Sequence, residues 1–183
     1  DMNKVISIGN QGFDKIREND YFYVDKTGFI KEWWESGDDV TLITRPRRFG
    51  KTLNMDMLKC FFSNQYTGRA DLFEGLSIWK EEKYRELQGQ YPVIFVSFAD
   101  VKERDYESAV RKIKHILVDL YLQYEFLKKN FSESEQMRYR QISYNMDNVA
   151  AQDALKSLAA LLSSYYGKKA IILLDEYDTP MQE

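Results

Sequence analysis

The sequence has one cysteine, one histidine and three prolines among its 183 residues. The single cysteine, Cys60, excludes a disulfide within the chain, and the single histidine, His115, excludes zinc sites built from several Cys and His residues. The same scarcity argues against catalysis by a Ser-His-Asp triad or a Cys-His pair. From this cysteine usage we expect an intracellular, cytoplasmic protein.

The sequence also lacks a run of about 18 apolar residues, and it lacks the residue order of a signal peptide at its start. We therefore expect no membrane-spanning segment, no membrane partner and no secretion. A formal charge of −3 with 44% hydrophobic residues is ordinary for a globular domain. It gives no overall electrostatic reason to bind nucleic acid, so such binding would need a local basic patch. The densest candidate is the cluster Arg45, Arg47, Arg48 and Lys51.

Apolar patterning predicts strands that alternate with helices. Near-continuous apolar or β-branched runs at about 39–44, 91–101 and 170–178 are typical of buried strands. Helical spacing of apolar residues predicts helices over about 26–35, 105–130, 132–142 and 149–165. A further helix is predicted after the loop RPRRFG, where apolar residues repeat at helical spacing from Leu53 to Phe62. Ser132 and Glu135 have the form of a capping box, and Gly167 is expected to end the last helix. The order is typical of an α/β fold with a mostly parallel sheet flanked by helices.

The stretch RPRRFGKT, residues 45–52, ends like a phosphate-binding loop and lies between a predicted strand and a predicted helix. In such a loop, backbone N–H groups and the positive end of the helix hold phosphate. Gly50 can supply the tight turn. Lys51 can reach the β- and γ-phosphates, and the Thr52 hydroxyl can bind Mg²⁺.

The loop departs from the usual pattern because Arg45 stands in place of its first glycine. Pro46 keeps Arg45 extended, so the chain must enter the loop by another path. We assign Arg47, Arg48 and Phe49 to the nucleotide-binding segment together with the turn that follows. The arginines could donate hydrogen bonds to phosphate, or they could pair with acidic side chains of the chain itself. Both interpretations stay open, since guanidinium groups suit phosphate and carboxylate equally.

The apolar run IILLDE ends in two carboxylates, Asp175 and Glu176. An acidic pair at a strand end is often only a solvated surface feature, but the upstream loop favours a phosphoryl-transfer site. In such a site one carboxylate holds Mg²⁺ and the next polarises the attacking water. We therefore predict Asp175 and Thr52 as metal residues and Glu176 as the catalytic residue. Ser97 and Asp100, near the end of another predicted strand, could edge a site.

Four segments carry a family resemblance: YFYVDKTGFIKEWWES, LITRPRRFGKTLNMDMLKCFF, YPVIFVSFADVK and YYGKKAIILLDEYDTPM. Together they resemble the bacterial AAA-ATPase-like family, whose members often carry a PD-(D/E)XK-type nuclease domain after the ATPase part. The resemblance implies a three-layer P-loop NTPase fold, with RPRRFGKT as its Walker A segment and Asp175 with Glu176 as its Walker B pair. It also implies that residues 1–183 are the N-terminal part of one ATPase domain. The chain would then be truncated after the Walker B strand, with the rest of the domain and any nuclease domain absent.

The resemblance implies ATP and Mg²⁺ as cofactors, and hydrolysis by a water that Glu176 orients. This piece alone is then expected to be a weak or inactive ATPase, because arginine contacts from elsewhere can contribute strongly to the rate. The alternative is a nucleotide-binding switch or scaffold domain with little turnover that controls an attached nuclease or partner. Nucleotide is the expected partner, whereas a nucleic acid reached through a downstream nuclease domain and a homo-oligomer both stay open.

The segment Tyr23–Thr27 has two open interpretations. The family resemblance includes its YVDKT motif, and related ATPases often contact the base upstream of the phosphate loop. The other interpretation is a structural turn before the helix that carries Trp33 and Trp34. Those two tryptophans could stack on bases, but their helical spacing favours packing in a core.

Overall fold

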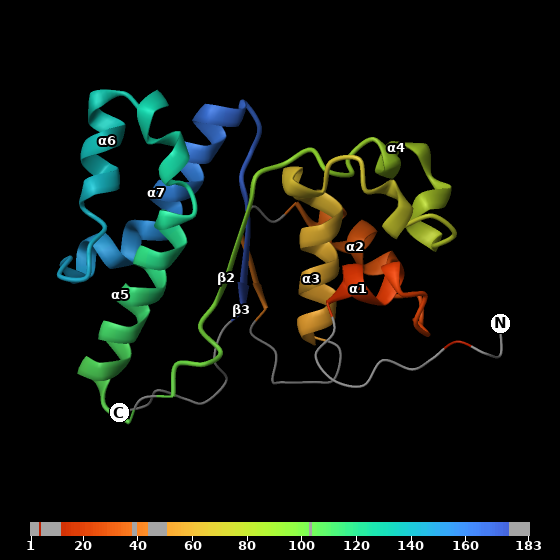
Figure 1. Ribbon diagram of the computed structural model, residues 1–183, viewed down its shortest axis with the longest axis horizontal. Coiled ribbons are helices and arrows are strands. Elements are labelled where there is room, and N and C mark those ends of the chain that lie inside the picture. Colours follow the sequence, from red (N-terminus) through yellow and green to blue (C-terminus); the bar gives the residue numbers. More distant parts are fainter. Residues whose placement is uncertain (1–3, 5–11, 38–39, 44–50, 103, 176–183) are drawn as a thin grey trace. The chain divides into compact units, whose positions relative to one another are not determined.

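The computed structural model describes residues 4, 12–37, 40–43, 51–102 and 104–175. These residues fall into two compact units (Figure 1). The first contains the described residues up to 40 together with 51–93, and the second contains 41–43 and 94–175. Helices and a small parallel sheet make the chain an α/β protein, as its patterning predicts. The expectation of a single ATPase domain stays a prediction.

The first unit is helical. Its elements are α1 (Phe13–Glu18), α2 (Gly28–Ser36), α3 (Lys51–Phe62), α4 (Glu82–Arg85) and the 3-10 turns η1 (Asn64–Tyr66), η2 (Ala70–Leu72) and η3 (Ser77–Lys80). The predicted helix at 26–35 and the one that carries Leu53 to Phe62 are therefore confirmed as α2 and α3. Helix α1 was not predicted, since its six residues are too few to show a helical period.

Aromatic rings in mutual contact form the core of this unit. Phe61 meets Phe62 and Phe73 edge-on, with ring centroids 4.9 and 5.0 Å apart, and Phe13 stacks on Phe73 at 5.1 Å. These four rings are fully buried. Such pairs add about 0.5–1.5 kcal/mol each to the gain from burial. They hold α3, which supplies Phe61 and Phe62, against α1 and the segment after η2.

The two tryptophans of α2 belong to the same core. The rings of Trp33 and Trp34 lie 5.0 and 5.4 Å from Phe62, and Trp34 also contacts Tyr91 at 5.5 Å. The predicted role in core packing is thus confirmed. Their indole rings pack against other aromatic rings of the first unit.

The sheet has three strands, β1 (Val40–Ile43), β2 (Val93–Ser97) and β3 (Ile171–Asp175), in the order β1-β3-β2. All three lie within the predicted strand segments. The central strand is β3, and its four residues before Asp175 are all buried. A central strand that is buried along its length needs the near-continuous apolar run by which it was predicted.

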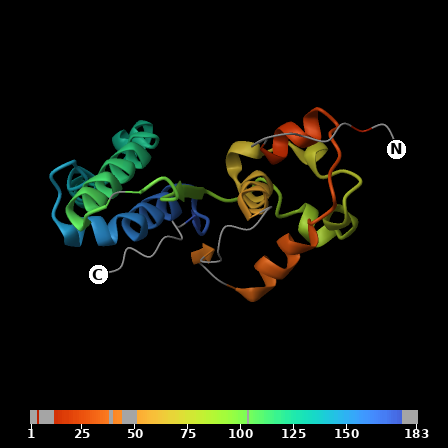
Figure 2. The same ribbon diagram turned by 90° about the horizontal axis from the view of Figure 1, so that it is seen from below.

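The helices of the second unit are α5 (Tyr106–Leu122), α6 (Glu133–Arg140) and α7 (Asn148–Tyr166), with the 3-10 segment η4 (Glu125–Asn130). They gather on one side of the strands in two perpendicular views (Figures 1 and 2). The capping box of α6 is confirmed, because Ser132 Oγ accepts from the Glu135 N–H while the Glu135 carboxylate accepts from the Ser132 N–H. Gly167 ends α7 in the left-handed conformation, with φ 67°.

The single long helix predicted over 105–130 is wrong. Helix α5 stops at Leu122, and Tyr124 leaves helical geometry with φ −109° and ψ 11° before η4 begins. The tighter winding of η4 places Leu127 in the core, fully buried. No glycine or proline marks this break, and the helical period of apolar residues continues through it, so the end of α5 could not be predicted from the sequence.

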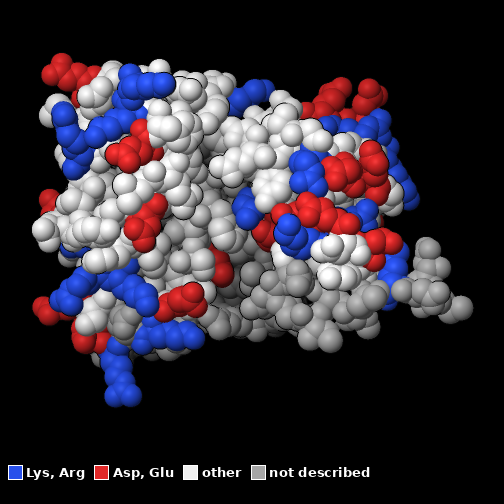
Figure 3. Space-filling view, in the orientation of Figure 1, with Lys and Arg blue, Asp and Glu red and all other residues white. Residues whose placement is uncertain are grey.

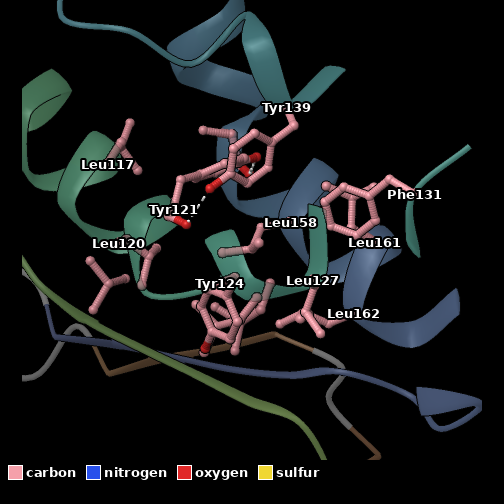
Figure 4. Packing of buried hydrophobic residues seen from close by; sticks show 14 of the residues in the cluster. Leu117, Leu120, Tyr121, Tyr124, Leu127, Phe131, Tyr139, Leu158, Leu161 and Leu162 are labelled. Carbon is pink, nitrogen blue, oxygen red and sulfur yellow. Dashed lines mark hydrogen bonds between the residues drawn. The ribbon is translucent and has the colours of Figure 1, made fainter. Parts of the chain in front are cut away.

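Helices α5, α6 and α7 meet in a core that combines leucines with hydrogen-bonded tyrosines (Figure 4). The Tyr121 hydroxyl donates to the Ala154 carbonyl at 2.6 Å, and the Tyr139 hydroxyl donates to the Tyr121 carbonyl at 2.8 Å. Burial raises the pKa of Tyr121, and it raises the pKa of Tyr124 to about 12, so both hydroxyls are protonated at neutral pH. The two bonds join α5 to α7 and α6 to α5.

The buried Tyr121 hydroxyl generates a test of this core. Tyr121→Phe removes the donor to Ala154 while keeping the ring, so the free energy of unfolding should fall by about 1 kcal/mol in urea denaturation. The matched control is Tyr106→Phe at the exposed start of α5, expected to change stability by less than about 0.5 kcal/mol. Equal stability of the Tyr121 variant and the wild type would contradict a stabilising bond.

Candidate functional site

Helix α3 begins where the phosphate-loop motif requires it. Strand β1 ends at Ile43, and α3 starts at Lys51 with Thr52 as its second residue. The motif thus lies between a strand and a helix, which is the context that distinguishes a phosphate loop from a chance Gly-Lys-Thr. The first N–H groups of a helix have no partner within it, and with the helix dipole they favour an anion.

Several predicted site residues lie outside the described part of the chain. They are Arg45, Arg47, Arg48, Phe49 and Gly50 in the loop and Glu176 after β3. For Lys51 and Thr52 the structure describes the backbone and not the side chains. The assignments of these residues, and the two interpretations of the arginines, stay predictions.

The middle of α3 is tied to its own unit by polar contacts as well as by aromatic packing. The N–H of Phe13 donates to Asp56 Oδ2 at 2.6 Å, and Lys59 pairs with Asp56 at 3.0 Å. The Tyr23 hydroxyl lies 3.3 Å from the Met57 sulfur. Helix α3 is thus held along its middle by α1 and by the chain before α2.

The segment Tyr23–Thr27 forms a hydrogen-bonded turn. The Asp25 carboxylate accepts from the Thr27 N–H at 2.9 Å, from the Thr27 hydroxyl at 2.6 Å and from the Ser77 N–H at 2.8 Å. The Thr27 oxygen, which is fully buried, also accepts from the Ile78 N–H at 3.2 Å. Burial alone would raise the pKa of Asp25, but these hydrogen bonds hold it below its usual value. The turn therefore joins the start of α2 to η3.

This geometry favours the structural interpretation of the YVDKT motif over contact with a base. The polar groups of Asp25 and Thr27 are engaged inside the unit. Their partners Ser77 and Ile78 lie about fifty residues further along. That stretch carries no motif, so this pairing has no signal in the sequence.

Asp175 is the predicted metal residue whose side chain the structure describes. It ends β3, is partly buried, and its Oδ2 accepts a hydrogen bond from the Ser97 hydroxyl at 3.2 Å. Ser97 ends the neighbouring strand β2, and the prediction that it edges a site stays a prediction. Asp100 lies in an exposed turn beyond it.

The donors predicted for Mg²⁺ suit a hard cation, since Asp175 and Thr52 would offer only oxygen atoms. Among the described residues, no cluster of three or more His, Cys, Asp or Glu could hold a metal ion by itself. Mg²⁺ in nucleotide sites needs no such cluster, because substrate phosphates and water complete its shell. The oxygen donors of Thr52 and Asp175 are thus of the type that Mg²⁺ prefers, and their assignment as metal residues stays a prediction.

Cys60 and His115 show no feature of a catalytic residue in the described part of the chain. Cys60 is fully buried on α3, and burial raises the pKa of its thiol to about 12, so the reactive thiolate is absent at neutral pH. His115 is exposed on α5 and its ring lies 4.2 Å from that of Tyr144.

Charge is mixed on the face of the molecule shown in Figure 3. Lys and Arg alternate with Asp and Glu on the face shown in Figure 3, and basic side chains gather at its lower left, over the first half of α5. Exposed Arg111 and Lys112 lie on that half, yet the acidic residues Asp105 and Glu107 lie beside them in sequence. Within the described residues, no helix is long and apolar enough to cross a membrane.

Thr27 offers a test of the structural interpretation of its motif. Thr27→Val keeps the shape but leaves the Ile78 N–H without this acceptor, so the free energy of unfolding should fall by about 1–3 kcal/mol. Urea denaturation measures the change. Thr27→Ser is the control, because it keeps the hydroxyl and loses only a methyl group. If the valine variant is as stable as the wild type, the turn does not depend on this hydroxyl.

Comparison with known proteins agrees with the motif. Residues 7–183 match the AAA-ATPase-like family, which is described as a predicted AAA-ATPase. The chain is 31% identical over 179 residues to an uncharacterized protein in the vnfD 5′ region of Azotobacter chroococcum mcd 1. That alignment covers 97% of this chain and 30% of the relative, so the chain spans about a third of the relative's length. No solved structure matches the chain. Because the family match runs over nearly the whole sequence, the chain belongs to the AAA-ATPase-like family.

Proposed function

We propose that this chain is the nucleotide-binding part of a P-loop NTPase that hydrolyses ATP in the presence of Mg²⁺. The observation that carries the proposal is the start of α3 at Lys51, directly after RPRRFG and downstream of β1. Family membership supports nucleotide binding, with ATP as the nucleotide. The strand β3 supports it further, since it ends in the carboxylate that such a site needs.

In this proposal the phosphates lie at the N-terminal end of α3. Backbone N–H groups from Gly50 onward bind the phosphate oxygens, and Lys51 neutralises charge on the β- and γ-phosphates. Arg47 and Arg48 donate further hydrogen bonds, and Phe49 completes the segment. Their charged donors would replace some of the hydrogen bonds to phosphate that the backbone could make if the first glycine were present.

Thr52 and Asp175 would hold Mg²⁺, which when bound neutralises charge on the phosphate oxygens. Glu176 orients a water molecule and accepts its proton as the water oxygen attacks the γ-phosphorus. The bond from the γ-phosphorus to the bridging oxygen breaks, and ADP and phosphate leave. Residues 1–183 would be the N-terminal part of a three-layer ATPase domain that continues beyond the Walker B strand.

A second candidate is a switch or scaffold domain that binds nucleotide, turns it over little and controls an attached part. The length of the curated relative favours it. The aligned region is 30% of that protein, so about 70% of it lies outside and could include an attached part. A downstream nuclease domain is the attached part that the family resemblance suggests. A nucleic acid would then be a partner of that part, and a homo-oligomer would place further arginines at the site.

Lys51 tests nucleotide binding itself. Lys51→Ala should raise the Kd for Mg²⁺-ATP by about 10–100-fold, because a charge-assisted contact to phosphate contributes about 1.5–3 kcal/mol. Calorimetry on this chain and on the full-length protein measures the change. Lys156→Ala, at an exposed position of α7, removes the same charge elsewhere and should leave the Kd unchanged.

Two outcomes of this titration decide different points. If neither the chain nor the full-length wild type binds ATP, the proposal of a nucleotide site is wrong. If only the full-length wild type binds, residues beyond 183 complete the site.

Glu176 separates the two candidate functions. Glu176→Gln should reduce ATP turnover by the full-length protein about 10²–10⁴-fold while leaving ATP binding intact, because the amide cannot accept the proton of the attacking water. Phosphate release and ATP calorimetry measure the two effects. A wild type that binds ATP but has slow turnover that the substitution leaves unchanged would favour the switch.

A further inference from the structure

Ser97 and Asp175 are joined by a hydrogen bond although 78 positions separate them in the sequence. Both end strands that lie next to each other in the sheet, β2 and β3. The Ser97 Oγ lies 3.2 Å from Asp175 Oδ2, and both residues are partly buried. Asp175 is the proposed Mg²⁺ ligand. Because the carboxyl ends of parallel strands meet at one edge of a sheet, Ser97 lies at the same edge as this ligand.

The direction of this bond follows from the donor inventory. A serine hydroxyl has one hydrogen to donate, and an ionised carboxylate has none. The Ser97 oxygen also accepts a hydrogen bond from the Ala99 N–H at 3.2 Å, which uses a lone pair and leaves its hydrogen for Asp175. Ser97 is therefore the donor and Asp175 the acceptor.

The main chain reinforces the same contact. The Phe98 N–H donates to the Asp175 carbonyl at 2.7 Å, so the backbone and the side chain of Asp175 are bound by two consecutive residues at the end of β2. The Ala99 bond in turn fixes the Ser97 hydroxyl within that turn. The Ser97 hydroxyl thus bonds the Asp175 carboxylate directly, while the other two hydrogen bonds fix the Asp175 main chain and the Ser97 hydroxyl itself.

We propose that Ser97 is a positioning residue that orients the Asp175 carboxylate for Mg²⁺ bound with the nucleotide. The inference rests on the proposed function, because it assigns a partner to the metal residue of that site. Hydrogen bonds to ligating carboxylates fix their orientation, and loss of such an outer partner typically weakens metal binding about 10–100-fold. Ser97 contacts neither nucleotide nor metal in this proposal and acts through Asp175.

The test titrates Mg²⁺ into the full-length protein at saturating ATP and follows binding by calorimetry. Ser97→Ala should raise the Mg²⁺ concentration for half-maximal binding by about tenfold. The affinity for ATP in EDTA should stay as in the wild type, because the phosphate loop is intact. Ser97→Thr keeps the hydroxyl and should bind Mg²⁺ as the wild type does.

Controls separate positioning from a general loss of structure. Ser164→Ala, at an exposed position of α7, should leave both affinities unchanged. Equal loss of ATP affinity in Mg²⁺ and in EDTA would show that Ser97 only supports the fold and would overturn the proposal. Wild-type Mg²⁺ affinity in Ser97→Ala would also overturn it. If the alanine variant does not fold, Ser97→Cys, a weaker donor, should give an intermediate Mg²⁺ affinity, and wild-type affinity there would count against the proposal.

The same titration distinguishes the two proposals. If the wild type shows no Mg²⁺-dependent ATP binding, the proposed function fails and Ser97 has no metal to serve. If the wild type binds and both alanine and cysteine variants match it, only the role of Ser97 fails.

Discussion

Burial of the central strand β3 is the constraint on which the second unit depends. Residues Ile171–Leu174 are all buried, and each such side chain contributes about 1.5–3 kcal/mol by leaving water. If β3 shifted by one residue relative to its neighbouring strands, apolar side chains would still point to both faces of the sheet. The apolar run alone therefore does not fix the register of β3, and the position where the run ends does. Asp175 marks that end, because a carboxylate is costly to bury without partners. The strand thereby delivers a carboxylate to the edge of the sheet.

The first unit depends on a different interaction, the contact of aromatic rings around Phe61, Phe62 and Phe73. These rings hold α3 from its C-terminal half, while Asp56 and Met57 tie its middle to α1 and to the segment before α2. The residues proposed to bind phosphate lie at the opposite end of the same helix. A rigidly held helix is a suitable support for them, since a displacement of about 1 Å at a catalytic site can cost about 10²-fold in rate.

Much of the fold could be predicted because its elements are locally consistent. The strands follow from apolar runs, α6 from its capping box and the end of α7 from Gly167. The predicted helix over 105–130 failed at Tyr124, where core packing of Leu127 outweighs helical continuity and no glycine or proline signals the turn. Helix α1 was missed because six residues hold only one and a half turns of pattern.

The sequence by itself determined the kinds of element, the strand before RPRRFG and the helix after it, and the acid at the end of β3. These features depend on neighbouring residues, which a local pattern records. Only the tertiary structure decided which distant groups become partners. It pairs Asp25 and Thr27 with Ser77 and Ile78, and Ser97 with Asp175. The reason is physical: a buried polar group must find a partner, and the order of strands and the packing of turns select which one is within reach.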